Sequence, residues 1–168
     1  MSIDVSSLSL DSALNMALTA EAESANLYEK LRDSVSNFVM KDKLEFLIKE
    51  EKKHQAIVES LFKKLFPMRE PKPEKTSLIP GIKVAIEKET SVPDLLELAM
   101  DAEMTFEKFY QDLAEEVENL GTQELLIYLS TMEHGHYALL RGEYDLCSRD
   151  EDYYNRGDFQ YDMVHIGP

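Results

Sequence analysis

Eight polar residues of this sequence form four pairs of identical residues, and the two members of each pair are 82 positions apart. The four pairs are Glu21 and Glu103, Tyr28 and Tyr110, Glu51 and Glu133, and His54 and His136. Apolar residues such as Leu14 and Leu96 share the same offset. Because copies of a repeated sequence adopt the same local structure, the repeat predicts a molecule built from two similar halves.

The spacing of apolar residues predicts four long helices, at about residues 10–33, 38–66, 92–119 and 122–147. Asn37 and Ser91 are suitable N-caps, and Pro67 marks the end of the second helix. The prolines of residues 68–77 indicate a solvated connection, and residues 78–90 contain room for one short helix. Short turns within each helix pair and one long crossover between the pairs are the connectivity of a ferritin-like four-helix bundle. We therefore expect an all-α fold of two helical hairpins.

The end of the chain differs from the rest. We expect one bundle domain over residues 1–148 and an irregular, extended C-terminal tail over residues 149–168. In the tail, Phe159, Tyr161 and Met163 alternate with polar residues and show no helical period. Alternation of this kind is typical of extended chain. We expect the tail to lie along the bundle or along a neighbouring subunit.

Each half places a histidine three residues after a glutamate. Positions three apart lie on one face of a helix, about 5–6 Å apart at Cβ, so both side chains can reach one ion. Glu21 and Glu103 lie on apolar stripes near the middle of their own helices. Four carboxylates turned into a dry core would repel one another, and burying even one without a partner is costly. Two divalent cations balance four carboxylates in charge, so the pattern predicts a dimetal site.

One Glu-x-x-His pair alone would be weak support for a metal site, because glutamate is frequent in this chain. Two pairs at one offset, each one helix after a Glu-x₆-Tyr pair, are much more specific. The alternative is a set of structural carboxylates, with Tyr28 and Tyr110 as ordinary core aromatics.

One glutamate from each of two helices and Glu-x-x-His from each of the other two is the ligand pattern of ferritin-like dimetal proteins. With its Glu-x₆-Tyr pairs, the chain most resembles the rubrerythrin branch over about residues 10–147. The resemblance implies that Glu51 and Glu133 are bridging carboxylates and that His54 and His136 are terminal ligands. It also implies that Glu21 and Glu103 are terminal carboxylates, and that Tyr28 and Tyr110 orient carboxylates. No catalytic residue is assigned beyond the metal ligands.

The chain departs from full-length rubrerythrins at two points. Those proteins resemble this chain with an added Cys₄ rubredoxin domain, which the one cysteine here, Cys147, cannot build. Rubrerythrins also carry an additional glutamate three residues after the helix-three ligand, and their peroxide-linked iron movement depends on it. That position is Phe106 here, and its counterpart in the first half is Ser24. Electrons must then come from an external donor, such as a rubredoxin-like protein.

The resemblance implies two iron ions as cofactors, with manganese or zinc as possible substitutes. Carboxylates with two imidazoles suit iron or manganese better than copper. We expect an oxidoreductase that oxidises Fe(II) or reduces hydrogen peroxide or O₂. The alternatives are an iron-handling protein without significant catalysis and a di-iron oxygenase of an organic substrate.

Charge and hydropathy limit the partners. The net charge of −15 would repel nucleic acid phosphates. No uninterrupted apolar run approaches the roughly 20 residues of a membrane span, and no targeting segment is recognisable. We expect a cytoplasmic protein, and the resemblance implies a homodimer.

Overall fold

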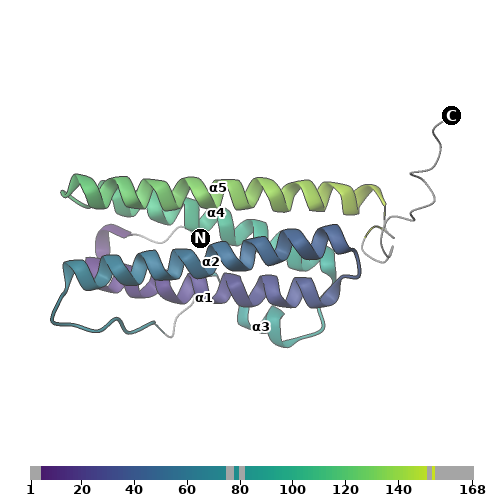
Figure 1. The fold of residues 1–168 in the computed structure, drawn as a ribbon, viewed down its shortest axis with the longest axis horizontal. Coiled ribbons are helices and arrows are strands. Elements are labelled where there is room, and N and C mark those ends of the chain that lie inside the picture. Colours follow the sequence, from purple (N-terminus) through teal and green to yellow (C-terminus); the bar gives the residue numbers. More distant parts are fainter. Residues whose placement is uncertain (1–4, 75–77, 80–81, 151–152, 154–168) are drawn as a thin grey trace.

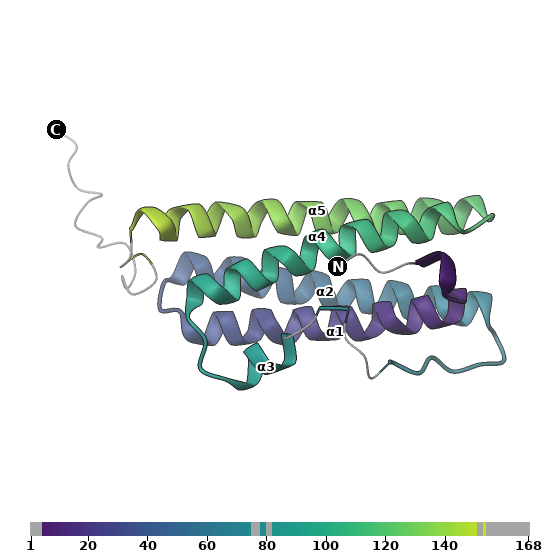
Figure 2. The same cartoon turned by 180° about the vertical axis from the view of Figure 1, so that it is seen from behind.

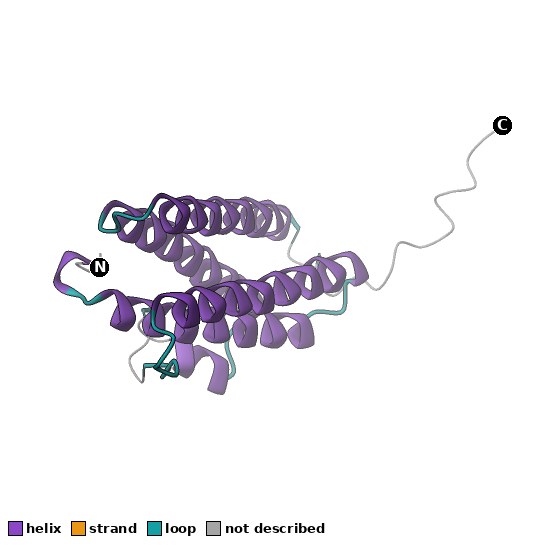
Figure 3. Cartoon of the chain, turned by 60° about the vertical axis from the view of Figure 1, so that its left-hand side comes forward, coloured by secondary structure: helices purple, strands orange, loops and turns teal. Residues whose placement is uncertain are grey.

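All regular structure in the described part of the chain is helical (Figure 3). The computed structural model describes residues 5–74, 78–79, 82–150 and 153. Its elements are η1 (Val5–Ser7), α1 (Leu10–Ser34), α2 (Phe38–Leu65), α3 (Ile82–Glu87), α4 (Val92–Glu115) and α5 (Leu120–Arg149). The expected all-α, ferritin-like class is confirmed. None of the described helices combines the length and the apolar character that a membrane span requires.

The four long helices form two antiparallel hairpins, α1 with α2 and α4 with α5 (Figures 1 and 2). The hairpins pack against each other, and α1 and α4 run in opposite directions where they meet. Their facing sides are apolar, and leucines at repeated positions in both halves are fully buried. These include Leu14, Leu47, Leu96 and Leu129, each 0% exposed. The polar residues of the repeat therefore lie inside an apolar core.

Three of the four long helices begin where side chains cap them. Asn37 accepts a hydrogen bond from the Met40 amide at 2.9 Å, and Asn119 accepts one from the Thr122 amide at 3.0 Å. Ser91 caps α4 as expected. A capping residue has extended backbone angles, here φ −77° and ψ 112° at Asn119, and cannot continue the preceding helix. Helix α4 therefore ends before Asn119, at Glu115, and α5 begins at Leu120 rather than at residue 122.

The crossover between the hairpins lies along α1 (Figure 1). The Thr19 hydroxyl donates to the Glu74 carbonyl at 2.9 Å, and the Lys72 amide donates to Asn15 Oδ1 at 2.8 Å. Further along, α3 packs on α1, and the ammonium of Lys30 donates to the Ile86 carbonyl at 2.7 Å. The expected short helix is thus present, and the crossover covers the outer side of α1.

The end of α5 is fixed to the bundle by buried polar contacts. Glu143 is 1% exposed, forms an ion pair with Lys43 of α2, and accepts a hydrogen bond from the Tyr153 hydroxyl at 3.0 Å. The Asn37 side-chain amide donates to the Tyr153 carbonyl at 3.4 Å. The alternating part of the expected tail, with Phe159, lies outside the described residues.

Candidate metal centre

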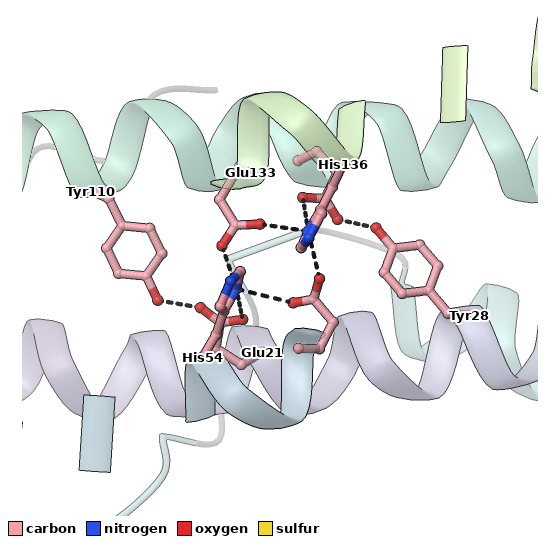
Figure 4. A network of polar contacts seen from close by, with 8 residues as sticks. Glu21, Tyr28, His54, Tyr110, Glu133 and His136 are labelled. Carbon is pink, nitrogen blue, oxygen red and sulfur yellow. Dashed lines mark hydrogen bonds and ion pairs between the residues drawn. The ribbon is translucent and has the colours of Figure 1, made fainter. Parts of the chain in front are cut away.

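The repeated glutamates and histidines meet at the middle of the bundle (Figure 4). Helices α1 and α4 contribute one glutamate each, and α2 and α5 contribute one glutamate and one histidine each. The six side chains are at most 2% exposed: Glu21, Glu51, His54, Glu103, Glu133 and His136. The structure thus brings together all six residues for which the sequence predicted one site.

Around His54, three carboxylates face the same ring nitrogen. Its Nδ1 lies 3.0 Å from Glu133 Oε1, 3.4 Å from Glu21 Oε2 and 3.8 Å from Glu51 Oε2. These carboxylates come from three helices, α5, α1 and α2. One nitrogen and three oxygens therefore surround one point in the core.

His136 repeats this arrangement with the halves exchanged. Its Nδ1 lies 2.9 Å from Glu51 Oε1, 3.3 Å from Glu133 Oε2 and 3.6 Å from Glu103 Oε2. Glu51 and Glu133 each direct one oxygen to each imidazole, whereas Glu21 and Glu103 each face one imidazole only. The arrangement is that of two adjacent clusters sharing two carboxylates. The two imidazole rings are stacked, with centroids 5.2 Å apart.

The atoms of the two clusters lack hydrogen-bond partners among the described residues. Both nitrogens of each histidine and both oxygens of Glu51 and Glu133 are buried and unsatisfied, as is Oε2 of Glu21 and of Glu103. They lie close together without hydrogen-bond geometry. Metal bonds to nitrogen or oxygen are about 2.0–2.2 Å long, which places neighbouring ligand atoms of one ion about 3.0–3.4 Å apart. The observed separations are near this range, so the residues fit a pair of metal ions.

The two tyrosines connect one hairpin to the other. The Tyr28 hydroxyl of α1 donates to Glu103 Oε1 of α4, and the Tyr110 hydroxyl of α4 donates to Glu21 Oε1 of α1. Both side chains are at most 1% exposed. Burial and the nearby carboxylates raise the pKa of each phenol well above its usual value, so both stay protonated and can donate. Each tyrosine therefore holds one carboxylate and leaves its other oxygen for the site.

Burial and mutual proximity shift the pKa values of the carboxyl groups in the metal-free protein. Burial, followed by the neighbouring carboxylates, raises the pKa of Glu51 well above its usual value. Burial and Glu133 raise the pKa of Glu103 well above its usual value. Burial also acts to raise the pKa of Glu133, but the imidazoles of His136 and His54 outweigh it and lower the pKa to about 2.

On the imidazoles, burial acts in the opposite direction, toward a lower pKa. Burial acts to lower the pKa of His54, but Glu133 and Glu21 outweigh it and raise the pKa to about 10. The pKa of His136 also rises to about 10, because Glu103 and Glu133 outweigh burial. Without metal, the cluster therefore keeps protons that balance its carboxylates. A divalent cation would displace them, since metal ligands bind in their deprotonated forms.

One buried polar residue of this region had no role predicted from the sequence. Ser24 of α1 is 1% exposed, and its hydroxyl has no hydrogen-bond partner in the described part of the molecule. The sequence does contain a signal, because the residue 82 positions later is the apolar Phe106. At this position the repeat that built the site is broken.

Comparison with known proteins gives two matches. The family model described as Rubrerythrin matches residues 12–144. A solved structure titled as a hypothetical protein from Pyrococcus furiosus superimposes with a TM-score of 0.80 and 32% sequence identity, over 87% of this chain and 94% of that one. No curated protein matches the chain.

Proposed function

Because this chain belongs to the rubrerythrin family, we propose that it is a di-iron oxidoreductase that oxidises Fe(II) or reduces hydrogen peroxide or O₂. One observation carries the proposal. Glu51 and Glu133 each direct their two oxygens to two different imidazoles, which is how carboxylates shared by two ions are arranged. The family match and the buried Glu and His group support the same assignment.

We assign the ligands from the distances around each imidazole. One metal position is served by His54 with Glu21, and the other by His136 with Glu103. The shared carboxylates serve both. Carboxylate oxygens with one imidazole per position favour iron or manganese, because no thiolate is offered. Iron is the metal we propose, with manganese or zinc as possible substitutes.

When bound, a pair of iron ions supplies the electrons that reduce a small oxidant. The protein contributes position and environment. Tyr28 and Tyr110 fix the outer carboxylates through hydrogen bonds from the opposite hairpin. Such supporting contacts orient ligands and tune the site. The candidate ligands are at most 2% exposed, and the exclusion of bulk water strengthens the electrostatic interactions among them.

An oxidoreductase of this kind needs an electron source. The chain contains one cysteine, the buried Cys147, and cannot hold an iron site of four cysteines. We propose that a separate rubredoxin-like protein delivers the electrons, and that the chain acts as a homodimer.

The test begins with metal-free protein and Fe(II) added without oxygen. We expect two iron ions per chain. Hydrogen peroxide is then added, and the iron oxidation is followed by its ultraviolet and visible absorption, with turnover measured in the presence of a reductant. Iron bound without turnover would identify an iron-handling protein and contradict the oxidoreductase assignment.

A pair of variants on α5 separates the site from general effects of charge. Glu133→Gln keeps the shape of the side chain and removes its charge, and we expect iron binding and turnover to be lost. Glu124→Gln makes the same change at an exposed position of the same helix and should leave both unchanged. Equal behaviour of the two variants would argue against the proposed site.

A further inference from the structure

Ser24 follows the candidate ligand Glu21 by three residues on α1, and its side chain is buried with an unsatisfied hydroxyl. Hydroxyl groups inside helices usually donate to the carbonyl four residues earlier. Ser34, Thr105 and Thr131 do so in this molecule, at 2.8–2.9 Å. The Ser24 hydroxyl makes no such bond. A buried unpaired hydroxyl is costly, so it requires an explanation.

The direction of Ser24 follows from its place on α1. Successive residues of a helix are about 100° apart around its axis. Viewed along the axis of α1, Ser24 therefore lies about 60° to one side of Glu21, and Glu29 lies about 80° to the other side. Glu29 forms an ion pair with Lys52 of α2 at 3.2 Å, which identifies its side as the one facing α2. Ser24 therefore lies on the side that faces α4.

The height of Ser24 along the bundle follows from the two tyrosine bonds. Tyr28 reaches Glu103 and Tyr110 reaches Glu21, and α1 and α4 are antiparallel. The middle of the segment between Glu21 and Tyr28 therefore lies opposite the middle of the segment between Glu103 and Tyr110. Ser24 occupies the first position, at the centre of the wall that α1 and α4 form beside the candidate ligands.

The opposite position on α4 is Phe106, which is 1% exposed. The wall is thus uneven at its centre, although the ligands around it follow the repeat. One side presents a small side chain with a free donor, and the other presents a ring that makes no hydrogen bond. This difference gives the two-fold repeated site one polar side.

We propose that the Ser24 hydroxyl is the hydrogen-bond donor for a small, electron-rich ligand of two or three atoms that enters the site at the α1–α4 wall. The inference rests on the proposed function, because it needs metal in the bundle. Dioxygen, peroxide and small anions such as azide share this chemistry. Ser24 binds the ligand and contributes no bond to the metal, and Phe106 closes the opposite side.

Azide is the probe for this proposal, because its uptake by an oxidised iron protein changes the visible absorption. We compare Ser24→Ala with the unchanged protein after iron loading and iron analysis. Iron content should be equal, and azide affinity should fall by about 10-fold, as expected for one hydrogen bond to a charged group. Equal iron content with equal azide affinity would overturn the proposal.

A second measurement needs no metal. Because the hydroxyl has no partner in the described part of the protein, Ser24→Ala should leave the melting temperature of the metal-free protein unchanged or raise it. The matched control is Thr19→Val on the same helix, which removes a hydroxyl bonded to the Glu74 carbonyl. That variant should melt about 2–4 °C lower, with azide affinity unchanged.

The remaining outcomes also decide the question. If Ser24→Ala lowers the melting temperature as much as Thr19→Val does, the hydroxyl has a partner within the protein and the proposal is wrong. If iron is lost only in Ser24→Ala, the residue holds the metal rather than the small ligand, and the proposal is also wrong. If the unchanged protein binds no iron, the proposed function itself fails and this inference fails with it.

Discussion

The first hairpin, α1 with α2, and the second hairpin, α4 with α5, carry largely the same polar residues on their inner faces. The residues on their outer faces differ. Inside, the glutamates, histidines and tyrosines of one half have counterparts in the other, and the contacts they make are also repeated. Outside, Asn15 and Thr19 of α1 are buried beneath the crossover, whereas their counterparts on α4, Glu97 and Asp101, are exposed. The repeat is therefore kept at the candidate ligands and their tyrosines, and it is lost where the crossover covers one half only and, on the inner faces, at Ser24 and Phe106.

Because the inner faces are repeated, we expect matching substitutions in the two halves to weaken iron binding equally. These are the largest effects that we predict. Glu51→Gln and Glu133→Gln each remove a carboxylate shared by both metal positions. Each should weaken iron binding by about 100-fold or more, because even supporting contacts around a metal contribute 10–100-fold. Metal analysis after dialysis measures this. A large loss in one variant with a normal iron content in the other would show that the halves are not equivalent.

The pH dependence of the metal-free protein tests the paired imidazoles. The pKa of His54 and of His136 is about 10 in the folded protein, against about 6.5 when unfolded. Their contribution to stability is complete below pH 6.5 and is lost as the pH rises toward 10, at up to about 1.4 kcal/mol per pH unit for each proton. Thermal unfolding of the metal-free protein should therefore shift to lower temperature between pH 6.5 and 10. Iron-loaded protein should show a smaller shift, and a flat profile without metal would contradict the assignment.

The tyrosines make the comparison sharper, because each one serves the other half. Tyr28→Phe leaves Glu103 Oε1 without a donor, and Tyr110→Phe does the same for Glu21 Oε1. Each variant should weaken iron binding by about 10-fold or more, and the two losses should be similar. Isothermal titration of Fe(II) without oxygen measures both. If neither variant changes the affinity, the tyrosines are core aromatics only.

Because the outer faces differ, we expect substitutions at corresponding positions to change the free energy of unfolding by unequal and smaller amounts. Thr19→Val removes a buried hydrogen bond to the crossover and should lower the free energy of unfolding by about 1 kcal/mol. Asp101→Asn alters the counterpart on α4, which is exposed, and should change it by less than about 0.5 kcal/mol. Urea unfolding of the two variants checks the difference. Equal destabilisation would mean that both outer faces are covered in solution.

The sequence predicted most of this inner architecture because the repeat and the helical period are local signals. Asn37 and Ser91 marked helix starts, and the offset of 82 positions grouped the six candidate ligands before their contacts were known. The end of α4 was predicted about four residues too late, at residue 119, whereas α4 ends at Glu115 and Asn119 caps α5.

Contacts between distant parts of the chain that the repeat does not mark could not be predicted from the sequence. The burial of Asn15 depends on how the crossover folds back on α1, and that of Glu143 depends on Lys43, 100 residues earlier. The exchange of tyrosine bonds between the hairpins depends on the register of α1 against α4. These features are set by tertiary packing, which a local pattern does not encode.

The most direct test of the account is the location of iron in crystals grown from iron-loaded protein, measured by anomalous scattering at the iron edge. Two peaks about 3.5–4 Å apart, both within bonding distance of Glu51 and Glu133 and each next to one histidine, are the predicted result. Peaks at the surface alone, or a bundle centre without iron in crystals that contain it elsewhere, would contradict the account.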